Sequence, residues 1–84
     1  MKKILLDARE MPHPEPLQHA LSYLQKMSNE EYLYMLNRKK PIPLIEVAKE
    51  KVFAHHSYED RPNSCWHILI CKDIDCNLEE LLDV

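Results

Sequence analysis

The first half of the chain shows two different patterns of apolar residues, short apolar runs and a helical spacing. Residues 3 to 7 form a short, mostly apolar run of strand length. Residues 31 to 37 form a second such run, rich in aromatic and aliphatic side chains. Between them, residues 14 to 27 place apolar side chains at steps of three and four, which predicts a helix with one apolar face: Leu17, Ala20, Leu21, Leu24 and Met27.

The second half of the chain continues with a basic loop, residues 38 to 43, that enters another helix. This helix is predicted from about Pro43 to Lys51, with one apolar face formed by Leu44, Val47 and Ala48. Residues 52 to 59 and 64 to 72 predict a β-hairpin around a turn at residues 60 to 63. The run from Asn77 to Glu80 resembles a capping box before a short helix with the apolar stripe Leu78, Leu81 and Leu82.

The order β-α-β-α-β-β predicts the fold class. A strand-helix-strand unit makes its two strands parallel, with a right-handed crossover. We therefore expect an α/β (α+β) two-layer sandwich, in which two helices cover one face of a four-stranded mixed sheet. Tyr32 and Tyr34 alternate along their strand and therefore share one face of the sheet. If this is the face without helices, they form an apolar, aromatic surface there together with His67 and Leu69. Either a partner, such as a second copy in a homodimer, or the terminal apolar stripe would cover it.

Composition narrows the function classes. The chain has 84 residues, 45% of them hydrophobic and 30% charged, which is typical of one small globular domain. A formal net charge of -3 argues against broad nucleic-acid binding. The absence of glycine excludes a P-loop or a Rossmann phosphate loop. Cys65, Cys71 and Cys76 lack zinc-ribbon spacing, so we expect free thiols in a reducing cytoplasm, no membrane association and no cofactor.

The loops that follow the two parallel strands leave the same edge of the predicted sheet. Ligands of open α/β sheets favour the carboxyl ends of strands, and helix N-termini carry positive potential. We therefore predict an anion-attracting edge with these binding residues: Arg9, Glu10, His13, Glu15, Arg38 and Lys39. The competing interpretation is a solvated Arg9–Glu10 pair, a basic turn, and a His13 that only spaces two structural prolines.

The hairpin suggests a candidate metal site, which we favour less than a chain that binds no metal. If the turn centres on residues 61 and 62, His56 faces His67 and Tyr58 faces Cys65 on one side of the sheet. His56, His67 and Cys65 could then ligate zinc or a similar metal. A shift of the register by one residue would move these side chains to the other face and destroy the cluster.

The N-terminal motif resembles that of the TusA/SirA-like sulfur-relay proteins. Those proteins carry Leu-Asp, a short spacer and then Cys-Pro-x-Pro at the start of the first helix. Here Leu6-Asp7 is followed by the run His13-Pro14-Glu15-Pro16. The runs Leu6-Asp7-Ala8-Arg9-Glu10 and Pro12-His13-Pro14-Glu15-Pro16 look closer to those of uncharacterised bacterial TusA-related domains, which lack the sulfur-carrying cysteine. The resemblance implies a TusA-like domain, which we place at residues 1–72, with strand order 1-2-4-3. Residues 73–84 fall outside the resemblance, and we expect them to form an acidic tail with a short helix.

The departure from the TusA motif decides the predicted function. His13 stands where the relay proteins have cysteine, and an imidazole cannot hold a persulfide. We therefore predict a non-catalytic binding or adaptor protein that holds a protein partner or a small anionic ligand near His13. The alternative is a sulfur or redox relay that uses another thiol, Cys71 or Cys65.

Overall fold

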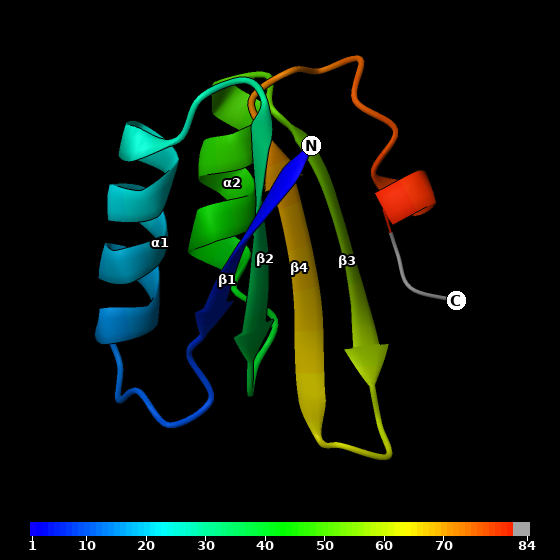
Figure 1. The fold of residues 1–84 in the computed structure, drawn as a ribbon. Helices are drawn as coiled ribbons and strands as arrows, with labels where there is room; N and C mark the ends of the chain where they lie inside the picture. The colour runs from blue at the N-terminus through cyan, green and yellow to red at the C-terminus, as the bar shows by residue number, and fades with distance from the viewer. Residues whose placement is uncertain (82–84) are drawn as a thin grey trace.

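The computed structural model describes residues 1–81 and confirms the predicted element order (Figure 1). The chain runs through a first β-α-β unit, a second helix, a hairpin and a terminal 3-10 helix. The elements are β1 (Lys2–Asp7), α1 (Glu15–Lys26), β2 (Glu31–Asn37), α2 (Ile42–Glu50), β3 (Ala54–Asp60), β4 (Cys65–Cys71) and η1 (Leu78–Leu81).

The four strands form one mixed sheet in the order β1-β2-β4-β3, as predicted. β1 pairs parallel with β2, and β4 pairs antiparallel with both β2 and β3. The carboxyl ends of β1 and β2 therefore lie at the same edge, because parallel neighbours end together. The loops to α1 and from β2 to α2 both start from this edge.

Both helices lie on one face of the sheet and enclose the main core (Figure 1). Side chains from alternate strand positions meet the apolar helix faces there, as the period-two pattern requires. Members with no measurable exposure include Leu33, Met35, Leu44, Ile68 and Ile70. Phe53 and Trp66 pack against the same core.

The other face of the sheet carries neither α1 nor α2, and we call it the open face. It is partly covered by η1 (Figure 1). A second, smaller cluster joins Leu78 of η1 to Tyr32, Leu69 and Cys71 of the sheet, and Leu81 packs at its edge. The tail thus covers the end of the sheet near Tyr32, as one of the two alternatives predicted. Leu82, the third residue of the predicted apolar stripe, lies outside the described residues.

No helix among residues 1–81 combines the length and the apolar character needed to cross a bilayer. The longest, α1, has 12 residues, whereas a transmembrane helix needs about 20.

Candidate functional site

A cavity of about 590 Å³ lies at the sheet edge where both helices begin. His13 and the basic loop border it, and the first turns of α1 and α2 close its apolar side. Its lining residues include four basic side chains and no carboxylate, although acidic residues outnumber Lys and Arg in the chain. The lining consists of Met11, His13, Pro16, Leu17, Asn37, Arg38, Lys39, Lys40, Pro41, Pro43 and Leu44. We call this cavity the basic pocket.

Prolines shape both helix starts at the basic pocket. The His13–Pro14 peptide bond is cis, and α1 begins at Glu15, one residue later than predicted. Glu15 donates its amide to the Pro12 carbonyl, and Pro16 has no amide hydrogen. In the described part of the chain, Leu17 is therefore the position in the first turn of α1 whose amide stays available. A helix start usually leaves four amides available, so α1 offers fewer donors than usual.

The start of α2 follows the same logic. Ile42 donates its amide to the Lys40 carbonyl, and Pro43 has no donor. Leu44 is thus the counterpart of Leu17, and both line the basic pocket. Because so few amides remain, the positive potential here depends mainly on the basic side chains.

The basic loop is ordered by two contacts. The Asn37 side-chain amide donates a hydrogen bond to the Lys39 carbonyl over 3.0 Å. The ammonium nitrogen of Lys40 lies 5.5 Å from the centre of the Trp66 ring, a cation–π distance. The loop thus follows directly from the end of β2 and contacts β4 through Lys40 and Trp66.

The structure brings together half of the predicted binding residues. His13, Arg38 and Lys39 line the basic pocket, and Lys40 joins them; Arg9, Glu10 and Glu15 do not line it. The guanidinium of Arg9 instead binds the Asp7 carboxylate, with N···O distances of 2.9 and 2.7 Å. Asp7 points to the open face because its neighbour Leu6 is buried on the helix side. This ion pair holds the pKa of Asp7 at about 2, below its ordinary value of 3.8.

A polar network occupies the open face at the hairpin end of the sheet. The Tyr34 hydroxyl lies 2.6 Å from His67 Nδ1, and the Asp60 carboxylate lies 3.0 Å from His67 Nε2. The Tyr58 ring stacks on the His67 ring, with centroids 4.7 Å apart and planes 9° from parallel. Cys65 Sγ approaches His67 Nε2 to 3.8 Å.

The hairpin register differs from the predicted one by two residues. The structure pairs Tyr58 with His67, Asp60 with Cys65, and His56 with Leu69. The loop comprises residues 61–64, because the Asp60 carboxylate accepts hydrogen bonds from the backbone and side-chain amides of Asn63. The expected faces are correct, but Asp60, and not His56, comes together with Cys65 and His67. The sequence signal for this register is Asp60 at the end of the strand followed three residues later by Asn63, which donates both hydrogen bonds to the Asp60 carboxylate.

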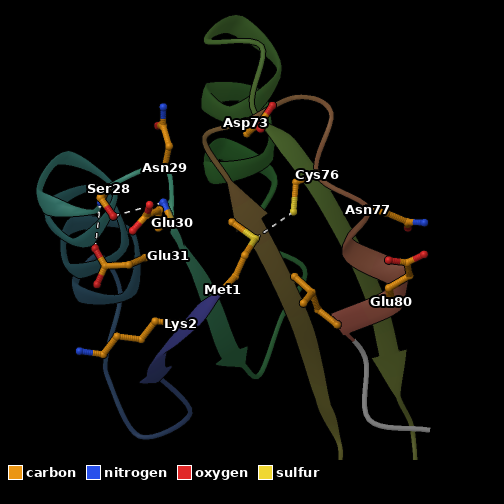
Figure 2. A pocket seen from close by; sticks show the side chains of 11 residues that line it. Met1, Lys2, Ser28, Asn29, Glu30, Glu31, Asp73, Cys76, Asn77 and Glu80 are labelled. Carbon is orange, nitrogen blue, oxygen red and sulfur yellow. Dashed lines mark hydrogen bonds between the residues drawn. The ribbon is translucent and has the colours of Figure 1, made fainter.

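A second cavity, of about 840 Å³, lies at the opposite end of the sheet beside the N-terminus (Figure 2). Met1 points toward Cys76 from one side, with the two sulfur atoms 3.4 Å apart. The Ser28 amide donates to the Glu31 carboxylate on the other side, which lowers the pKa of Glu31. Carboxylates dominate the charge of its rim, namely those of Glu30, Glu31, Asp73 and Glu80.

The three thiols are poorly placed for nucleophilic chemistry. Cys65 is 3% exposed and Cys71 has no measurable exposure. Burial, followed by a hydrogen bond with Cys71, raises the pKa of the Cys76 thiol to about 11. A thiol must ionise to act as a nucleophile, so Cys76 is unreactive near neutral pH.

Comparison with known proteins identifies a family but no activity. No curated protein and no solved structure matches the chain. A family model described as "Uncharacterized conserved protein (DUF2249)" matches residues 5–72, which include the basic pocket and the open-face network. The match covers most of the 84 residues. The chain therefore belongs to the DUF2249 family of uncharacterized conserved proteins.

Proposed function

We propose that this protein is a non-catalytic binding module that holds an anionic ligand in the basic pocket. The observation that carries the proposal is the charge of the lining: the cations Arg38, Lys39 and Lys40, beside His13, line a cavity to which no carboxylate contributes. In a chain with a net charge of -3, this local excess of cations favours a carboxylate or phosphate group.

The apolar side of the pocket adds a second property of the ligand. Met11, Leu17 and Leu44 contribute apolar surface next to the cations. A volume of about 590 Å³ lies within the range of roughly 300 to 1,000 Å³ typical of small-molecule sites. We therefore infer that the ligand joins an anionic group to an apolar or aromatic part, either as a small molecule or as a segment of a protein partner.

The resemblance to TusA/SirA-like proteins supports binding without sulfur transfer. We propose a common ancestry from the shared element order and the proline-rich helix start, with His13 in place of the sulfur-carrying cysteine. The alternative of a relay through Cys65 or Cys71 is weakened by the burial of both thiols. A reducing cytoplasm suits the three free thiols and is the location we propose.

The single tryptophan provides a direct test of anion binding. Lys40 lies over the Trp66 ring, so an anion that draws Lys40 away changes the fluorescence of Trp66. Phenyl phosphate and benzoate are suitable probes, and benzyl alcohol is the neutral control. We expect saturable changes with both anions and none with the alcohol, weakening as salt screens the charges.

Variants locate the binding. The double variant Arg38→Gln/Lys39→Gln removes two cations and leaves Lys40 over Trp66 as the reporter. We expect its Kd for phenyl phosphate to rise at least about tenfold, because a lost charge-assisted contact contributes roughly 1.5 to 3 kcal/mol. Lys49→Gln, in the last turn of α2 away from the pocket, is the matched control and leaves the Kd unchanged. Equal binding of the neutral alcohol, or an unchanged Kd in the double variant, contradicts the proposal.

A further inference from the structure

We propose that Asp60, Cys65 and His67 form a zinc-binding site at the hairpin end of the open sheet face. One ligand atom from each residue lies within 4.8 Å of the other two. This site is separate from the basic pocket and shares no residue with it.

The hairpin register places the three side chains together. Asp60 is the last residue of β3 and pairs with Cys65, the first residue of β4. His67 follows Cys65 by two positions and so projects from the same face of the sheet. The ligands therefore come from two hydrogen-bonded strands joined by a four-residue loop, which is a rigid base for a metal.

The two distances from His67 Nε2 to the other ligand atoms are close to those around a tetrahedral zinc ion. Bond lengths for zinc imply separations of about 3.6 Å between a nitrogen and a sulfur ligand and about 3.3 Å between a nitrogen and an oxygen ligand. The corresponding distances here are 3.8 Å from His67 Nε2 to Cys65 Sγ and 3.0 Å from His67 Nε2 to Asp60 Oδ2. The third pair, Cys65 Sγ and the Asp60 carboxylate, lies within 4.8 Å, and rotation of the two side chains would bring these atoms to a shared metal.

His67 is already oriented for metal binding through Nε2. Its Nδ1 atom lies 2.6 Å from the Tyr34 hydroxyl, and Tyr58 stacks on its ring. When Nε2 binds a metal, the ring proton resides on Nδ1 and is donated to the Tyr34 oxygen. A neutral ring that donates Nε2–H to Asp60 in the absence of metal would bind zinc by shifting its single ring proton from Nε2 to Nδ1, with no net loss of a proton from the imidazole.

Asp60 is held in place from the other side. Its carboxylate accepts hydrogen bonds from the Asn63 side chain over 2.8 Å and from the Asn63 backbone amide over 3.4 Å. These bonds, with that from His67, lower the pKa of Asp60.

The ligand types and their burial indicate zinc and an open coordination position. A set of one thiolate, one imidazole and one carboxylate suits zinc, whereas magnesium and calcium prefer oxygen ligands alone. Cys65 is 3% exposed, but the His67 and Asp60 side chains are 16% and 20% exposed. Solvent therefore reaches the site, and three protein ligands leave the fourth position to water.

Cobalt is the probe that reports the thiolate directly. The full chain, purified without a histidine tag and stripped of metal with a chelator, is titrated with Co²⁺ and then with Zn²⁺. We expect one equivalent of Co²⁺ to produce a near-ultraviolet thiolate-to-cobalt charge-transfer band and tetrahedral d–d bands, which Zn²⁺ then removes. Cys65→Ser should abolish the charge-transfer band, while Cys76→Ser, the control thiol, should retain it.

Variants of the other ligands separate coordination from folding. Asp60→Asn and His67→Gln should raise the Kd for Zn²⁺ more than about 100-fold, and Tyr34→Phe, a positioning variant, about 10- to 100-fold. His56→Ala, the control on the same strand as Asp60, should bind as the original chain does. Circular dichroism identifies variants that fail to fold; if His67→Gln does, Asp60→Asn at the strand end carries the test. A charge-transfer band that survives Cys65→Ser, no band at all, or equal losses in His56→Ala and Asp60→Asn overturns the site.

Discussion

Leu78 is the main attachment of the tail to the open face, and Leu78→Ala should loosen that attachment. Leu78 is 5% exposed and belongs to the smaller apolar cluster with Tyr32, Leu69 and Cys71. The substitution removes three buried carbon groups, each contributing about 0.8 kcal/mol. Because η1 is a four-residue helix that can settle into the void, the added cavity cost stays small, and we expect the low end of the range for buried leucines, about 2.5 kcal/mol of lost unfolding free energy.

Two measurements separate local detachment from global destabilisation. Urea unfolding followed by Trp66 fluorescence reports the helix-side core, because Trp66 packs there. Alkylation followed by fragment mass spectrometry reports Cys71, which has no measurable exposure in the cluster under η1. In Leu78→Ala, we expect alkylation of Cys71 to accelerate under native conditions while Cys65, at the other end of β4, stays protected.

Leu5→Ala is the matched control for this test. Leu5 points to the same face from the edge strand β1 but is 57% exposed. Its truncation should change the free energy of unfolding by less than about 0.5 kcal/mol. If Leu78→Ala leaves both stability and Cys71 labelling unchanged, the packing of η1 on the sheet does not stabilise the fold and the reasoning is refuted.

Two further predictions concern ionisation. The folded-state pKa of Asp7 is lowered from 3.8 to about 2, so its ion pair with Arg9 contributes stability above pH 3.8 that is lost as the pH falls toward 2. The pair is nearly half exposed, so Asp7→Asn should lower the unfolding free energy by less than about 1 kcal/mol. Chemical denaturation should show a larger loss at pH 7 than at pH 2, and the opposite order would contradict the predicted pH dependence. Alkylation of Cys76 should accelerate about tenfold per pH unit between pH 8 and pH 10, because its pKa is about 11 and the thiolate is the reactive form. A rate that levels off near pH 9 would mean that the thiol has an ordinary pKa and would contradict the prediction.

The period of the apolar residues was sufficient to predict the helices and strands, but not their order in the sheet. Three-and-four spacing at Leu17, Leu24 and their neighbours identified α1, and short apolar runs identified the strands. The handedness rule then made β1 and β2 parallel, which placed their loops at one edge. The strand order was predicted from family resemblance, because apolar period alone does not order strands within a sheet.

The site residues that were wrongly placed have local causes. Arg9 is close to His13 in sequence, but Asp7, one position after buried Leu6, draws it to the opposite face of the sheet. His56 was expected opposite His67, but the hydrogen bonds from Asn63 to Asp60 fix a four-residue loop and move the register by two. Both errors follow from single side-chain interactions that hydrophobic periodicity does not encode.

The basic pocket was only partly predictable for a different reason. The positions of Arg38 and Lys39 after β2 and of His13 before α1 indicated a shared edge. The apolar side of the cavity comes from the first turns of two helices, at Leu17 and Leu44, whose positions depend on how the helices pack on the sheet. The number of available amides also depends on prolines and turn hydrogen bonds that a helix-dipole argument leaves out.

The central claim, anion binding in the basic pocket, is tested most directly by amide chemical shifts of isotope-labelled protein titrated with phenyl phosphate. The account predicts saturable shifts at residues 13–17 and 37–44, centred on the Leu17 and Leu44 amides, with much smaller shifts for benzyl alcohol. Shifts centred on the open face at residues 58–67, or no saturable shifts at any residue, would contradict it.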